Sequence, residues 1–95
     1  MIKPTIGRVV WFWENNPNQP AQSQPHAALV AYVHSDTMVN LAVFDAGGNL
    51  FPRTSVWLRQ DDDPAPAGAY CEWMPYQKGQ AAKTEALEAA AGKAA

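Results

Sequence analysis

The stretch SDTMVNLAVFDAGGNLF, residues 35–51, decides the fold of this chain. A polar turn leads into a strand in which every second residue, Val39, Leu41 and Val43, is aliphatic. The strand ends at a Gly-Gly pair, and glycine adopts the positive φ of a tight turn without steric cost. Apolar segments lie on both sides, so the stretch predicts the middle of a three-strand meander.

Four further strands are predicted from segments rich in β-branched and aromatic residues. These segments are residues 6–13, 26–34, 53–58 and 69–74. Residues 14–25 form a polar loop longer than a hairpin needs, and loops of this length often carry function. Residues 60–68 contain two prolines and three adjacent acids, which indicates an exposed connector rather than a strand.

The composition changes at Gln77 to alanine, lysine, glutamate and glutamine. Alanine is the best helix former, so a helix is predicted from about residue 80 to residue 91, ended by Gly92 and anchored only by Leu87. The chain therefore divides into a β-domain over residues 1–76 and an Ala-rich C-terminal helix or tail over residues 77–95.

Five short strands with a long first loop and tight middle turns predict an all-β fold, a small five-stranded SH3-like partly open barrel. An OB-type barrel is the alternative. That fold usually carries a helix between its third and fourth strands, where this chain has only the Gly-Gly turn.

Composition excludes several functional classes. The 95 residues suffice for one domain, and the net charge of −2 argues against binding of duplex nucleic acid, which usually needs a basic patch. The single Cys71 cannot form an intramolecular disulfide. There is no secretory signal pattern and no apolar run near the ~18 residues that span a bilayer, so we expect a cytoplasmic protein without membrane contact.

Four tryptophans are unusual in so short a chain. Trp11 and Trp13 share one face of the first strand, and Val10 and Phe12 share the other. Either the tryptophans fill the core or they form a stacking platform, which is worth ~1–3 kcal/mol per stacked base. The aromatic candidates are Trp11, Trp13, Trp57, Tyr70 and Trp73.

Arginines are the natural partners for an anionic ligand, because a guanidinium recognises phosphate with two parallel hydrogen bonds. Arg53 is followed by Thr54 and Ser55, whose hydroxyls can add neutral donors. Arg8 lies among apolar neighbours, so its charge needs a partner. Asn40 is either a hydrogen-bonding group for a ligand or a structural tie to a neighbouring turn.

Catalytic and metal sites are not expected. His26 and His34 lie roughly 26 Å apart by strand rise and cannot share an ion within one protomer. Asp36 suits a turn, and the acids of residues 61–63 lie in a flexible connector. Ser55 has no evident base, and Cys71 has no activating histidine nearby in sequence. We therefore expect no catalytic residue, no metal and no cofactor.

Several of these segments, taken in order, resemble a group of small bacteriophage and prophage proteins. The group carries P-T-x-G-R-V-V near its start and S-D-x-x-V-N-L-x-V-F in the middle. The matching residues here are 4–10, 26–30, 35–44, 53–56 and Trp73. The resemblance covers residues 3–73 and leaves out the C-terminal tail.

The resemblance implies a phage-encoded anti-defence protein in the host cytoplasm. Such a protein would bind and sequester a nucleotide signal of bacterial immunity, a cyclic oligonucleotide or a cyclic ADP-ribose isomer, without cleaving it. Proteins that sequester a signal in this way, called sponges, tend to form homo-oligomers. The expected ligand-binding residues are Arg8, Trp11, Trp13, His26, Asn40, Arg53, Thr54, Ser55 and Trp73. The alternative is a non-enzymatic interaction or structural adaptor whose aromatic residues hold another protein.

Overall fold

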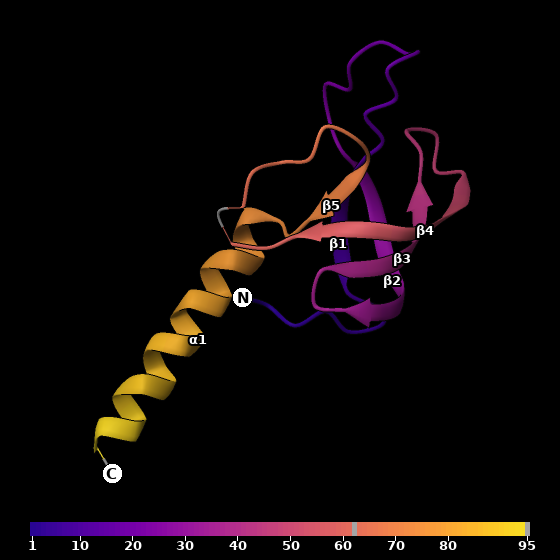
Figure 1. The fold of residues 1–95 in the computed structure, drawn as a ribbon. Helices are drawn as coiled ribbons and strands as arrows, with labels where there is room; N and C mark the ends of the chain where they lie inside the picture. Colours follow the sequence, from indigo (N-terminus) through magenta and orange to yellow (C-terminus); the bar gives the residue numbers. More distant parts are fainter. Residues whose placement is uncertain (62, 95) are drawn as a thin grey trace.

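The computed structural model describes residues 1–61 and 63–94, and it contains five strands followed by one helix (Figure 1). The elements are β1 (Val9–Trp13), β2 (His26–Ser35), β3 (Met38–Phe44), β4 (Leu50–Arg59), β5 (Tyr70–Glu72) and α1 (Pro75–Ala94). The predicted small all-β, five-stranded barrel with a C-terminal helix is confirmed. Residues 45–49 link β3 to β4 without a helix, which argues against the OB-type alternative.

The five strands form a closed barrel in the order β1-β2-β3-β4-β5. Strands β2, β3 and β4 form the three-strand antiparallel meander that the middle stretch predicts, and β1 extends it by pairing antiparallel with β2. Strand β5 pairs antiparallel with β1 and parallel with β4, so it joins the two edges of the meander. The partly open barrel expected from the sequence is therefore corrected to a complete ring, because the connector carries the chain across the open side.

Element ends differ from the predicted ones for local reasons. Strand β1 begins at Val9 because the chain turns before it, with Gly7 at φ 91° and the Arg8 N–H donating to the Thr5 carbonyl. Helix α1 begins earlier than predicted, at Pro75, because proline lacks the N–H that would be unsatisfied in a first turn. It continues through Gly92 to Ala94.

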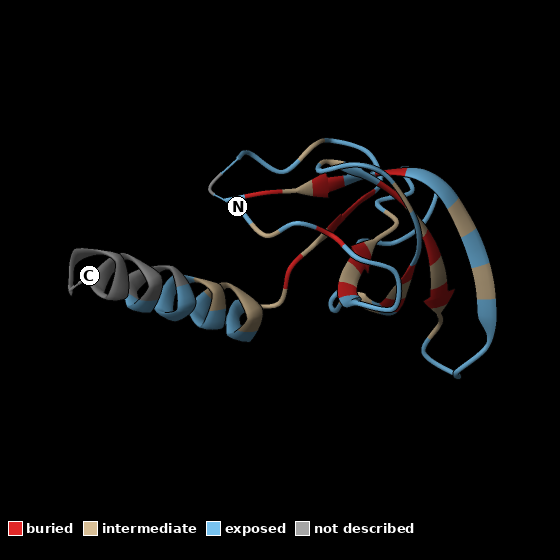
Figure 2. Cartoon of the chain, turned by 90° about the horizontal axis from the view of Figure 1, so that it is seen from below, coloured by how far each residue is buried: buried red, intermediate tan, exposed pale blue. Residues whose placement is uncertain are grey.

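Buried residues alternate with more exposed ones along β1 and β3, and Figure 2 shows the buried positions in red on the barrel strands. On β1 the inward residues are Val10 and Phe12, so the tryptophans of that strand lie on the outer surface. The core consists of fully or nearly fully buried side chains: Val10, Phe12, Ala28, Val30, Val39, Leu41, Val43, Val56, Leu58, Cys71 and Trp73. Burial of these aliphatic and aromatic groups is the main force that holds the barrel closed.

A β-bulge in β4 changes which residues face the core. Val56 and Leu58 point inward, and Arg53 pairs with Leu41, which is also a core residue. Arg53 and Val56 are three residues apart, and in a regular strand only residues an even number apart lie on the same face. The register shifts here, and Ser55 adopts a left-handed φ of 53°. The Asn40 side-chain oxygen accepts a hydrogen bond from the Ser55 N–H at 2.8 Å and so ties the bulge to β3.

One end of the barrel is plugged by Trp73 and a buried glutamine, Gln60, which is only 2% exposed. The Gln60 amide nitrogen donates to the carbonyls of Ile2 and Asp36 at 2.7 and 2.8 Å. Its oxygen accepts from the Ile2 N–H and from the Trp73 indole N–H at 3.3 and 3.2 Å. Gln60 thus joins the N-terminal segment, the β2–β3 turn and the core tryptophan.

Helix α1 leaves the barrel near β1 and extends away from it (Figure 1). The Gln77 side chain holds its first turn, since it accepts from the Met74 N–H and donates to the Val9 carbonyl, both at 2.7 Å. Within the described residues, this helix is not apolar over a length that would cross a membrane.

Candidate functional site at the mouth of the barrel

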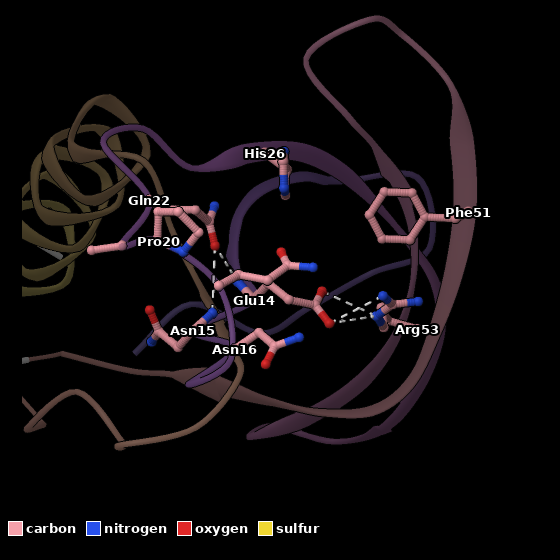
Figure 3. A pocket seen from close by; sticks show the side chains of 10 residues that line it. Glu14, Asn15, Asn16, Pro20, Gln22, His26, Phe51 and Arg53 are labelled. Carbon is pink, nitrogen blue, oxygen red and sulfur yellow. Dashed lines mark hydrogen bonds and ion pairs between the residues drawn. The ribbon is translucent and has the colours of Figure 1, made fainter.

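The inward positions of the barrel become polar or aromatic at the end opposite Trp73. Glu14 follows Phe12 by two residues, and His26 precedes the buried Ala28 by two. Phe51 and Arg53 pair across the sheet with core residues of β3. Figure 3 shows these four side chains pointing into the ring of strands, where they line a hollow of about 230 Å³. We call this hollow the mouth.

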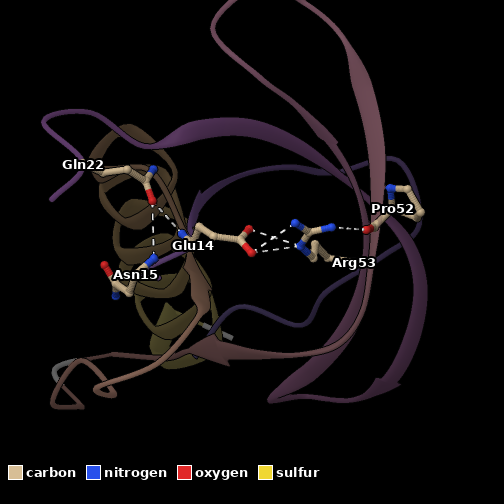
Figure 4. A network of polar contacts seen from close by, with 5 residues as sticks. All are labelled: Glu14, Asn15, Gln22, Pro52 and Arg53. Atoms are coloured by element: carbon tan, nitrogen blue, oxygen red, sulfur yellow. Dashed lines mark hydrogen bonds and ion pairs between the residues drawn. The ribbon is translucent and has the colours of Figure 1, made fainter. Parts of the chain in front are cut away.

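The centre of the mouth is an ion pair between Arg53 and Glu14 (Figure 4). The Arg53 Nε donates to both carboxylate oxygens at 3.1 and 3.2 Å, and Nη2 donates to one of them at 3.0 Å. The Nη1 group donates to the Pro52 carbonyl at 2.9 Å. The guanidinium plane is therefore held from two sides, and its paired donors match the geometry of a carboxylate or phosphate.

Aromatic rings support this arginine. The Arg53 guanidinium lies 4.5 Å from the centre of the Phe51 ring, a cation–π contact. The His26 ring meets Phe51 edge-on, with ring centres 6.1 Å apart and planes at 86°. The mouth therefore combines a fixed cation with two flat rings, one of which carries hydrogen-bonding nitrogens.

The β1–β2 loop forms one wall of the mouth. The Gln22 side-chain oxygen accepts from the backbone N–H groups of Glu14 at 2.7 Å and Asn15 at 3.4 Å. Asn15 adopts a left-handed φ of 48° and donates to the Gly68 carbonyl at 3.1 Å. These contacts tie the start of the loop to Gln22 in its later part, and side-chain amides of the loop line the hollow.

A second set of candidates lies outside the barrel. Trp13, Tyr70 and Trp57 are cross-strand neighbours on β1, β5 and β4 and so form an aromatic row on the outer surface. Trp57 is 38% exposed, whereas Tyr70, in the middle of the row, is 8% exposed. Burial is the main cause that raises the pKa of the Tyr70 hydroxyl above its ordinary value.

An ion pair lies beside this aromatic row. The Glu72 carboxylate accepts from the Trp13 indole N–H at 2.7 Å and from Arg59 at 3.3 Å. Arg59 also donates to the Asp63 carbonyl. Trp11 pairs with Glu72 on the same outer face and is half-buried. The tryptophans predicted for a stacking platform are thus on a convex surface and do not line the mouth.

A third set lies at the plugged end. Trp73, predicted to contact the ligand, is instead a core residue with 1% exposure, so its ring faces are occupied by protein. Arg8 covers that ring from outside, with its guanidinium carbon 5.8 Å from the ring centre. Among the described residues Arg8 has no ion-pair partner. It borders a groove of about 370 Å³ beside α1, together with the exposed Tyr76.

The remaining predicted residues serve the β-bulge. Two roles were considered for Asn40, ligand binding and a structural tie, and the structure places it in the second. Its side-chain oxygen accepts from the Ser55 N–H and is hydrogen-bonded to the His34 Nε2 at 2.9 Å. Thr54 and Ser55 are exposed in the bulge and do not line the mouth. Their hydroxyls therefore do not lie beside the Arg53 guanidinium in the mouth, although the three residues are consecutive in the sequence.

The groups considered for catalysis lie apart from one another. Burial raises the pKa of the Cys71 thiol to about 12, which keeps it protonated at neutral pH. Asp61 pairs with the N-terminal amine at 3.2 Å, and Asp62 lies outside the described residues.

The nine residues that the sequence predicted to bind the ligand thus lie in several separate places. Of these nine, only His26 and Arg53 lie together in the mouth.

Sequence reasoning missed Glu14, Phe51 and Gln60. Glu14 shares the parity of Val10 and Phe12, but this became a signal for the mouth only once packing had shown that this parity faces inward. The signal for Phe51 was hidden by the bulge, which changes the parity within β4.

Comparisons of this chain with protein-family models, with curated proteins and with solved structures find no match. The side-chain chemistry of the mouth and of the outer surface therefore carries the functional proposal.

Proposed function

We propose that this protein is a phage-encoded anti-defence protein that binds a nucleotide signal of host immunity, a cyclic oligonucleotide or a cyclic ADP-ribose isomer. It holds the signal without cleaving it and acts in the host cytoplasm. The single observation that carries the proposal is the mouth, in which the Arg53 guanidinium is fixed against the Phe51 ring and beside His26. Ligand sites commonly form in the mouths of β-barrels.

The chemistry of the mouth suits a nucleotide. Arg53 supplies paired donors for a phosphate, and its position on Phe51 fixes their direction. His26 and the side-chain amides of the loop supply neutral donors and acceptors for a base edge or a ribose hydroxyl. Each of these groups recognises a ligand by hydrogen bonding or contact, and none of them is required to move a proton.

Volume limits what one mouth holds. Pockets for drug-sized ligands have about 300–1,000 Å³, and the mouth has about 230 Å³. One mouth is therefore too small for a whole cyclic dinucleotide, so a phosphate of one half meets Arg53 and the other half lies outside the mouth. A second protomer bringing its own mouth to that half would satisfy a two-fold symmetric ligand, in agreement with the expected homo-oligomer.

The test is a ligand screen on the purified chain. Thermal shift and calorimetry against cyclic dinucleotides, cyclic trinucleotides and cyclic ADP-ribose isomers should identify one class that binds. Heating the complex should then release that nucleotide unchanged. Absence of binding across the panel would reject the sponge function, and release of a cleaved product would reject sequestration.

Two arginine variants locate the site. Arg53→Ala should weaken binding at least tenfold, since it removes a charge-assisted phosphate contact. Arg8→Ala, at the plugged end, is the matched control and should leave the affinity unchanged. The reverse result would move the site from the mouth to the groove beside α1.

A second candidate function rests on the outer aromatic row of Trp13, Tyr70 and Trp57. Partly exposed tryptophans beside an acidic group are suited to hold an extended peptide, as in aromatic grooves that bind proline-rich segments. In this adaptor function Trp57→Ala would abolish capture of the partner, whereas Arg53→Ala would have no effect. Proline-rich peptide libraries displayed against the wild type and Trp57→Ala separate the two functions.

A further inference from the structure

We infer that the Glu14 carboxylate is an internal stand-in for the anionic group of the ligand, so that the mouth is self-occupied until a phosphate displaces Glu14. The inference rests on the proposed function in that it assigns the regulation of the same site. It requires that the Arg53 guanidinium bind two anions alternately, the Glu14 carboxylate in the free protein and the phosphate in the complex.

The geometry of the pair carries the inference. Arg53 meets both oxygens of Glu14 through Nε and Nη2, at 3.0–3.2 Å. A phosphate uses the same two donors in the same plane. The guanidinium itself is held independently of Glu14, by the Pro52 carbonyl and the Phe51 ring. Removal of Glu14 therefore leaves an oriented cation rather than a loose one.

The pair is also exposed enough to exchange. The side chains of Arg53 and Glu14 are 41% and 29% exposed, so the carboxylate can return to water when it leaves. Exposed ion pairs contribute little to stability, because solvent screens the charges. Glu14 should therefore lower the affinity for an anion about fivefold without making binding impossible.

Glu14 is fixed at its backbone while its side chain is free to exchange. It directly follows β1, and its backbone N–H is held by the Gln22 side chain of the β1–β2 loop. Asn15, the next residue, has a left-handed φ. Glu14 thus takes part through its side chain in the pair with Arg53 and through its backbone in the wall of the mouth.

The experiment uses inorganic pyrophosphate as the probe and the full chain as the protein. Affinity is measured by calorimetry, and the Arg53 side chain is followed through its ¹⁵Nε resonance. Glu14→Gln keeps the shape of the side chain and removes its charge. We expect it to bind pyrophosphate about fivefold more tightly than the wild type, with a shift of the Arg53 resonance at saturation.

Controls separate this role from simple attachment of the loop. Glu72→Gln alters the other carboxylate–arginine pair, outside the mouth, and should leave the affinity unchanged. Adding Arg53→Ala to Glu14→Gln should abolish the gain. Glu14→Asp, whose carboxylate is one methylene too short to keep both contacts, gives a second reading should Glu14→Gln fold poorly, and it too should bind more tightly.

Equal affinity of the wild type and the Glu14 variants, an equal gain in Glu72→Gln, or an unmoved Arg53 resonance would each overturn the inference. Failure of the proposed function looks different. In that case Glu14→Gln binds pyrophosphate more tightly through Arg53, while neither protein binds any nucleotide of the panel.

Discussion

Gln60 offers the sharpest test of how the plugged end is built. Its side chain is 2% exposed and forms four hydrogen bonds, two with Ile2 and one each with Asp36 and Trp73. Gln60→Met keeps nearly the same length and flexibility but removes all polar atoms. The substitution therefore tests the hydrogen bonds without opening a large cavity.

The loss of stability in Gln60→Met depends on whether the former hydrogen-bond partners of Gln60 find new ones. The Trp73 indole N–H is buried and left unpaired, and a buried unsatisfied group costs about 1–3 kcal/mol. The groups of Ile2 and Asp36 are part-buried and regain water at a smaller loss. The free energy of unfolding should therefore fall by about 3 kcal/mol, a large share of the 5–15 kcal/mol that is typical of small domains.

The assay is urea denaturation, with calorimetry as the second measurement. For a domain of this size the melting temperature should fall by about 12–24 °C. Gln80→Met, at an exposed position of α1, is the matched control and should stay within about 0.5 kcal/mol of the wild type. A loss below 1 kcal/mol for Gln60→Met would refute the assignment of Gln60 as the joint of the N-terminal segment, the turn and the core.

Two further predictions concern the β-bulge and the β3–β4 turn. Asn40→Ala should lower the free energy of unfolding by about 1 kcal/mol, because the Ser55 N–H loses its acceptor. Ser55→Gly should be neutral or stabilising, because glycine adopts the left-handed φ without strain. Urea denaturation of both variants checks this, and a destabilising Ser55→Gly would contradict it. The Asn49 backbone N–H, and then the Asn49 side chain, lower the pKa of Asp45. The folded-state pKa is thus below the unfolded one, so the stabilisation is present above about pH 4 and is lost as the pH falls through the folded value. The advantage of the wild type over Asp45→Asn should therefore shrink in denaturation curves between pH 6 and pH 2, and an advantage independent of pH would contradict the assignment.

Much of the barrel could be predicted from alternation along the chain. Val39, Leu41 and Val43 share one face of β3 because side chains of a strand point to opposite sides in turn, and all three are core residues. The same rule left the first strand undecided, because both of its faces are apolar. Only packing showed that Val10 and Phe12 are inside and that Trp11 and Trp13 are outside.

The candidate site was harder to predict, because it depends on contacts between distant segments. Arg53 was found from its chemistry, but its partner Glu14 is 39 residues away. Nothing local in the sequence marks that pairing. The sequence left open whether the aromatic candidates fill the core or form a stacking platform, and the structure divides them: Trp73 belongs to the core, whereas Trp13, Tyr70 and Trp57 share the outer row.

By itself the sequence determined the all-β class, the five strands, the tight turn after β3 and the Ala-rich helix. Each of these follows from local preferences and periodicity, which act over a few residues. The tertiary structure decided the closure of the barrel by β5 and the direction in which Arg53 points. That direction depends on the bulge at Ser55 and its hydrogen bond to Asn40, a contact between two strands that no local rule encodes.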